Sequence, residues 1–278
     1  MRRVPAGIIA LDLDGTLLDS NKKLSQGNLE ALEKAAAAGY EIVPTTGRLF
    51  GGMPEIIRSL PFLNYAITIN GAQVEELSTG KVLYRAEIPW QQAIEVMEYL
   101  EQYPVIYDCY MDNQGWMTIA MLDQVDEVVE DVHYRKLIHD LRHPVPELKA
   151  YLAGRKQDVQ KIQFFVTSPE QKPELIAKLP QVFPDIVASS AISQNVEVNQ
   201  ARANKGDALL ALADYLGVPR EKTFAFGDGL NDLTMIQMAG VGIAMENAFP
   251  EAREVADWIT VSCDEDGVAR GIEKFILI

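Results

Sequence analysis

Cysteine and histidine are scarce in this chain. Its 278 residues include 2 cysteines and 3 histidines, and Cys109 and Cys263 stand far apart, without CxxC or Cys–His spacing. This usage excludes a disulfide framework and gives no support to a zinc site. We interpret both cysteines as buried thiols of a cytoplasmic protein.

Positive charge and long apolar runs are also lacking. Lysine and arginine number 25 against 40 acidic residues, a net charge of −15, so the surface as a whole repels nucleic acid and anionic membranes. No run approaches the roughly 20 apolar residues of a membrane span, and the N-terminus shows no secretory signal pattern. We expect neither a nucleic-acid nor a membrane partner, and the oligomeric state stays open between a monomer and a small homo-oligomer.

The alternation of apolar and polar segments predicts an α/β fold with an insertion. At both ends of the chain, strands alternate with helical patterns, which indicates a Rossmann-like parallel sheet with right-handed crossovers. In the middle, strands follow one another at short spacing, as is typical of an α+β unit. We predict a discontinuous core of residues 1–83 and 193–278 and an inserted α+β cap domain of residues 84–192. The predicted core strands are the apolar start of segment 8–18 and residues 40–44, 66–69, 223–226, 241–244 and 258–261.

Carboxylates follow two of these strands. Asp12 and Asp14 are separated by one residue of extended chain, so their side chains point the same way, and they repel each other unless a cation or a shared proton lies between them. A strand end with a helix-capping aspartate and a turn glycine is the alternative. Asp228 and Asp232 follow a second apolar strand, and strand ends of a parallel sheet share one edge. Carboxylates without histidine or cysteine indicate a hard cation, for which Mg²⁺ is the natural choice.

Four motifs in this order resemble those of the haloacid dehalogenase superfamily. They are Asp-Leu-Asp-Gly-Thr at 12–16, Thr-Gly-Arg at 46–48, Asn-Lys-Gly at 204–206 and Gly-Asp-Gly-Leu-Asn-Asp at 227–232. The Asn-Gly-Ala turn at 70–72, the long insertion and Glu-Asn-Ala at 246–248 resemble its Cof-type, class IIB branch. The resemblance covers the core, whereas the insert matches in placement and length alone.

The resemblance implies a Mg²⁺-dependent phosphatase that hydrolyses a small phosphorylated metabolite, such as a sugar phosphate, through an aspartyl-phosphate. Asp12 is then the nucleophile and Asp14 the general acid and base. The side chains of Asp12 and Asp228 and the backbone carbonyl of Asp14 then bind the metal, with Asp232 holding it directly or through water. The residues that bind the phosphoryl oxygens are then Leu13, Thr46, Gly47, Lys205 and Asn231. Thr46 and Lys205 are also predicted to be catalytic. Arg48 and Asn70 either reach the substrate or fix their own turns, and the insert closes over the site as a cap.

Two other functions stay open at this point. A phosphomutase would use the same aspartates, and release of inorganic phosphate rather than an isomerised sugar phosphate separates the two. A non-catalytic metabolite-binding protein could keep the fold. The sequence does not identify the metabolite.

Overall fold

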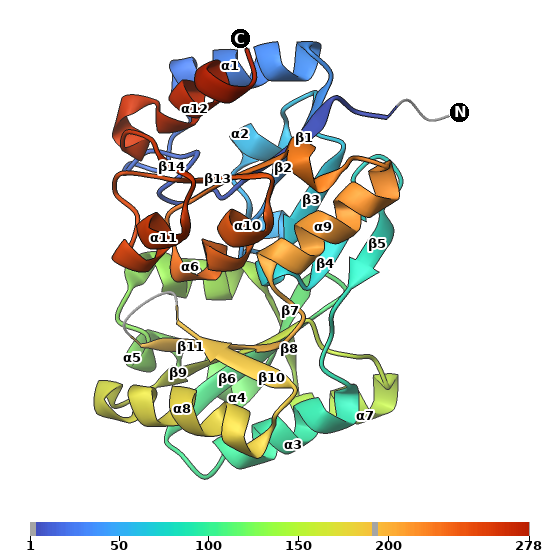
Figure 1. The fold of residues 1–278 in the computed structure, drawn as a ribbon. Helices are drawn as coiled ribbons and strands as arrows, with labels where there is room; N and C mark the ends of the chain where they lie inside the picture. Colours follow the sequence, from blue (N-terminus) through green and yellow to red (C-terminus); the bar gives the residue numbers. More distant parts are fainter. Residues whose placement is uncertain (1–3, 191–193, 278) are drawn as a thin grey trace. The chain divides into compact units, whose positions relative to one another are not determined.

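The computed structural model describes residues 4–190 and 194–277, and they form two compact units. The core unit comprises the chain up to residue 48, residues 53–85 and the chain from residue 202 onward. The insert unit comprises residues 49–52 and 86–201. Figure 1 shows both units coloured along the chain.

The ends of the insert unit differ from the predicted domain boundaries. The predicted start, residue 84, lies within β5 (Lys81–Arg85), which pairs with a core strand. The predicted end, after residue 192, lies outside the described residues. The insert unit extends to residue 201 because β11 (Asn195–Gln200) pairs with β9 (Lys161–Val166) and β10 (Ile186–Ser189) of its sheet.

The core unit contains a five-stranded parallel sheet in the order β14–β13–β12–β1–β2. All five residues of β1 and all five of β12 are buried, as expected for central strands covered on both faces. The predicted α/β core with a parallel sheet is confirmed. The strands are β1 (Gly7–Leu11), β2 (Tyr40–Pro44), β12 (Thr223–Gly227), β13 (Val241–Ala244) and β14 (Trp258–Ile259).

Helices cover both faces of this sheet (Figure 1). On one face, α9 (Lys205–Leu216) and α10 (Leu233–Met238) pack their apolar side chains against Ile8, Ala10 and Ala225. On the other, α12 (Gly267–Phe275) packs against Phe226 and lies beside α1 (Gln26–Ala37). The remaining core helices are α2 (Glu55–Arg58) and α11 (Pro250–Val255).

The strand predicted at 66–69 does not continue the parallel sheet. β3 (Tyr65–Thr68) touches it through a single parallel bridge between Thr45 and Ile67. It pairs antiparallel with β4 (Gln73–Glu76), which pairs with β5. The chain turns back because residues 69–71 all have positive φ, which ends the strand in a tight left-handed turn.

The insert unit is an α+β unit, as predicted. Its six-stranded sheet has the order β10–β11–β9–β6–β7–β8, antiparallel except for the β7–β8 pair. One face packs against α3 (Trp90–Leu100), α7 (Leu148–Arg155) and α8 (Lys172–Val182). The other elements are β6 (Val105–Met111), β7 (Gln114–Thr118), β8 (Arg142–Val145), α4 (Ile119–Leu122), α5 (Val125–Val128) and α6 (Val132–Leu141). Among the described helices of both units, none is long and apolar enough to span a membrane.

Candidate active site

Backbone pairing brings two aspartates to the same edge of the core sheet. β1 and β12 are parallel neighbours in which Leu11 lies opposite Phe226. The pairing continues past β1, because the backbone N–H of Asp12 donates to the carbonyl of Phe226 at 3.0 Å. Asp12 and Asp228 each follow the end of their strand, so the register alone places both at the carboxyl edge, where α/β sheets bind ligands.

Asp232 joins them to form an acidic cluster. Carboxylate oxygens of Asp12, Asp228 and Asp232 all lie within 4.8 Å of one another. Asp232 is 1% exposed, and its Oδ2 accepts hydrogen bonds from the backbone N–H groups of Asp228 at 2.9 Å and Gly229 at 2.8 Å. Asp232 therefore both belongs to the cluster and holds the turn that carries Asp228.

Lys205 is the buried cation of this cluster. Its Nζ lies 2.5 Å from Oδ1 of Asp12 and 2.6 Å from Oδ1 of Asp232, and the residue is fully buried. It is the first residue of α9, after the N-cap Asn204. A helix dipole disfavours a cation at this end, so we attribute the position of the ammonium group to the carboxylates rather than to the helix.

The charge of the cluster is incompletely compensated. Burial raises the pKa of Asp12 well above its usual range, and the charges of Asp232 and Asp228 add to the effect against the opposing influence of Lys205. Burial and then the charge of Asp232 raise the pKa of Asp228 to about 6. Burial alone would lower the pKa of Lys205, but Asp12 and Asp232 outweigh it and raise that pKa. Three carboxylates thus face one ammonium group.

These residues fit a divalent cation with hard ligands. Within the described part of the chain, the cluster offers carboxylate oxygens and no imidazole or thiolate. Mg²⁺ and similar ions prefer such oxygens, whereas zinc favours nitrogen and sulfur ligands. A bound cation would also offset the repulsion between carboxylates that, together with burial, raises the pKa of Asp12 and Asp228.

Replacing Asp228 by Asn tests this electrostatic picture. The pKa of Asp228 is higher in the folded protein than in the unfolded chain, so ionising this carboxyl group destabilises the fold. The free energy of unfolding of the metal-free wild type should therefore fall as pH rises from about 4 to 6. The D228N variant lacks this loss. We expect its metal-free form to be about 1–2 kcal/mol more stable than the wild type at pH 7.5, allowing for partial exposure.

Urea denaturation with a chelator, and again with Mg²⁺, measures this effect. Mg²⁺ should stabilise the wild type more than D228N, because a ligand that binds the folded state more tightly adds more stability. A metal-free D228N protein that is less stable than the wild type at pH 7.5 would contradict the picture. Asn can still accept the hydrogen bond that Thr16 Oγ1 donates to Oδ1 at 2.8 Å.

Asp14 has different partners from the acidic cluster. Arg48 holds its carboxylate in a bidentate pair, with Nε and a terminal nitrogen each 2.7 Å from a carboxylate oxygen, and Nζ of Lys22 lies 3.0 Å from Oδ1. Burial opposes ionisation of Asp14, but the hydrogen bonds and charges of Arg48 and Lys22 outweigh it and lower its pKa. Its carboxylate is ionised and paired with cations.

The other predicted residues lie in the loops that follow β1, β2, β3 and β12. Thr46 is buried, and its Oγ1 accepts a hydrogen bond from the N–H of Arg48 at 3.2 Å. Asn231 donates from Nδ2 to Oδ1 of Asn70 at 3.1 Å, and Asn70 also lies against Gly47. Leu13 is buried between the two aspartates, and its carbonyl accepts from the N–H groups of residues 16 and 18.

Three side chains complete the site beyond those predicted for it. Thr16 orients Asp228, Lys22 pairs with Asp14, and Nδ2 of Asn247 donates to the carbonyl of Gly15 at 2.8 Å. Thr16 and Asn247 stand in stretches that the sequence already marked. Lys22 carried no such signal, because its position depends on the turn that follows Asp19, where Lys22 itself has φ 61°.

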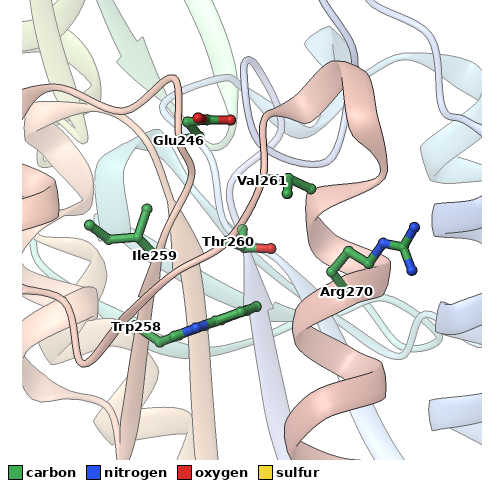
Figure 2. Close-up of a pocket in the computed structure, with 6 residues that line it drawn as sticks. All are labelled: Glu246, Trp258, Ile259, Thr260, Val261 and Arg270. Carbon is green, nitrogen blue, oxygen red and sulfur yellow. The ribbon is translucent and has the colours of Figure 1, made fainter.

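A separate hollow of about 390 Å³ lies beside β14. Figure 2 shows its lining, with Arg270 extending from α12 and Glu246 from the loop after β13. None of the residues of the acidic cluster lines it. The chemistry of the candidate active site is therefore built at the strand ends and not in this hollow.

The geometry agrees with what related proteins show. A family model described as haloacid dehalogenase-like hydrolase matches residues 9–272. The chain belongs to this family of hydrolases.

Relatives define its branch. Phosphatase YwpJ of Bacillus subtilis is 31% identical, covering 97% of this chain and 99% of its own length. Pyridoxal phosphate phosphatase YbhA of Escherichia coli is 27% identical, covering 97% and 98%. The solved structure of BT4131, a subclass IIB sugar phosphatase, shares the fold with a TM-score of 0.83 at 23% identity, covering 98% and 100%. The protein is a Cof-type phosphatase, a phosphoric monoester hydrolase, and the predicted family is confirmed.

Proposed function

We propose that this phosphatase depends on Mg²⁺ and hydrolyses a small phosphorylated metabolite through an aspartyl-phosphate on Asp12. One observation supports this most directly: Asp12 lies in a cluster with Asp228, Asp232 and Lys205, while Asp14 is held apart by cations. Two carboxylates in such different surroundings can take different roles.

In the first step, a carboxylate oxygen of Asp12 attacks phosphorus. A bond forms between this oxygen and phosphorus as the bond to the substrate alkoxide breaks, and Asp14 gives the alkoxide a proton. Asp14 is ionised while Arg48 holds it. Its protonation therefore requires that Arg48 release it, and the phosphate ester offers oxygens that this guanidinium can bind instead.

In the second step, Asp14 accepts a proton from water. The resulting hydroxide oxygen attacks phosphorus, the bond to Asp12 breaks, and inorganic phosphate leaves. Asp14 is ionised at this stage because it gave its proton to the alkoxide in the first step. The same residue thus acts as acid and then as base.

The surrounding groups bind the phosphoryl oxygens. Lys205 neutralises charge that spreads over these oxygens in the transition state. Thr46 and the amide of Gly47 bind them from the loop after β2, and the backbone at Leu13 binds them from the loop after β1. Asn231 either contacts phosphate or orients its own loop.

Asp12 and Asp228 would hold the Mg²⁺ ion, with Asp232 beside it directly or through water, and the backbone carbonyl of Asp14 as a further ligand. When bound, the ion neutralises the carboxylates and the phosphoryl oxygens.

We propose a sugar phosphate or a similar phosphomonoester as the substrate. The core residues recognise only the phosphoryl group, and relatives with this fold include a pyridoxal phosphate phosphatase and a sugar phosphatase. We also propose that the insert unit is a distinct domain, residues 84–192 by sequence and 86–201 by compactness, that discriminates between leaving groups.

Hydrolysis of p-nitrophenyl phosphate tests the proposed function. We expect phosphate release that requires Mg²⁺, stops with a chelator and resumes when Mg²⁺ is added. A panel of phosphorylated metabolites then identifies the preferred ester, and its products show whether phosphate is released or moved within the sugar. Hydrolysis that is insensitive to a chelator would contradict metal dependence, and isomerised sugar phosphate without phosphate release would indicate a mutase.

A further inference from the structure

The turn after β3 is strained and buried. Ile69, Asn70 and Gly71 have φ values of 54°, 58° and 93°, and all three are buried. Positive φ is uncommon for residues other than glycine and is a clear outlier for β-branched isoleucine. Such strained conformations persist only where the surrounding structure holds them in place.

The turn is bonded to the loop that carries Thr46. The N–H of Asn70 donates to the carbonyl of Thr46, and the N–H of Ile69 donates to the carbonyl of Arg48, both at 3.1 Å. Side-chain packing is equally close, because a Cβ added to Gly47 would lie 2.5 Å from Oδ1 of Asn70. The conformation of the 46–48 loop is therefore tied to the positive-φ turn.

The same turn contacts two further parts of the site. Oδ1 of Asn70 accepts a hydrogen bond from Nδ2 of Asn231 at 3.1 Å. Gly71 packs against the backbone of Asn204, the N-cap of the helix that begins with Lys205, so closely that a Cβ there would collide with the carbonyl of Asn204. Three site segments, distant in sequence, thus meet one three-residue turn.

We infer that residues 69–71 are a positioning element that sets the spacing between the phosphate-binding loop, Lys205 and Asn231. This inference rests on the proposed function. It assigns Asn70 to positioning rather than to substrate contact, because the same Oδ1 receives the amide of Asn231 and lies against Gly47. In the observed conformation the turn contacts all three segments.

Gly71→Ala tests the inference, and Gly80→Ala is its matched control. Gly80 also has positive φ, at 68°, but lies in the turn between β4 and β5, where an added Cβ meets nothing nearer than 3.8 Å. Both variants strain a left-handed turn, whereas only Gly71→Ala also pushes on Asn204. We expect G71A to lower kcat for p-nitrophenyl phosphate by about tenfold or more, and G80A to stay within about twofold of the wild type.

Asn70→Gly covers the case in which G71A does not fold. Glycine adopts positive φ readily, so this variant keeps the turn and removes only the amide that anchors Asn231. We expect its kcat to fall about tenfold at temperatures well below its Tm. N70G with a kcat within about twofold of the wild type, or equal losses in G71A and G80A, would overturn the inference.

A binding measurement separates this inference from the proposed function. If the wild type hydrolyses no phosphate ester, the proposed function fails, and calorimetry with inorganic phosphate and Mg²⁺ then tests the turn alone. An affinity about tenfold weaker in N70G supports the positioning role, and an unchanged affinity overturns it.

Discussion

The variant Asp12→Asn is expected to release no measurable phosphate, with kcat reduced by roughly 10⁴-fold or more. An amide oxygen is a far weaker nucleophile than a carboxylate, and the loss removes the covalent step altogether. The fold should remain, because Oδ1 of Asn can still accept the hydrogen bond that Lys205 donates to Asp12 at 2.5 Å.

Asp214→Asn is the matched control for D12N. Asp214 is an exposed residue of α9 outside the acidic cluster, so D214N makes the same chemical change without touching the site. Phosphate release by both variants is measured beside their thermal unfolding. Undiminished turnover in D12N would refute the nucleophile assignment, whereas equal losses in both variants would point to the assay or the preparation.

Replacing Lys205 by Met should damage both activity and stability. Lys205 is fully buried between Asp12 and Asp232, and removing one partner of a buried pair costs about 3–5 kcal/mol. Loss of its charge from the transition state should lower kcat by about 10²–10³-fold. Mg²⁺ can replace part of the missing positive charge, so it should raise the Tm of K205M more than that of the wild type.

Lys161→Met provides the matched control for K205M. Lys161 is another fully buried lysine, paired with Oε1 of Glu197 at 2.7 Å in the insert sheet. K161M should also lose stability, but Mg²⁺ should restore it no better than it stabilises the wild type. Thermal unfolding of both variants with chelator and with Mg²⁺ measures the difference. Equal restoration in the two variants would contradict a metal bound at the acidic cluster.

Strands and motifs of the core could be predicted because their signals are local. The apolar run before Asp12 and the one before Asp228 are each followed at once by a carboxylate, and parallel topology then requires the two ends to share an edge. The family resemblance rested on the same short segments. The apolar runs do not reveal the order and register of the strands, which determine the distances between the carboxylates of the site.

The small sheet of β3, β4 and β5 was harder to predict. β4 reads Gln-Val-Glu-Glu, so a single apolar residue marks it, and its pairing depends on a turn that begins with Ile69. A β-branched residue argues against positive φ, so the sequence conceals the feature that bends the chain back. The Lys22–Asp14 pair was also hidden, because Lys22 has positive φ in a tight turn that its residue type does not indicate.

Because of the register between β1 and β12, the site should tolerate exchanges of apolar side chains in these strands but not deletions. Main-chain hydrogen bonds pair β1 with β12, so exchanges among apolar side chains, such as Ile9→Val, can weaken the core without changing which residues follow the two strands. Deleting one residue from Thr223–Gly227 would instead turn the following side chains to the opposite face of the sheet. Along these buried strands, a change of side-chain volume acts on stability, whereas a change of length displaces the carboxylates.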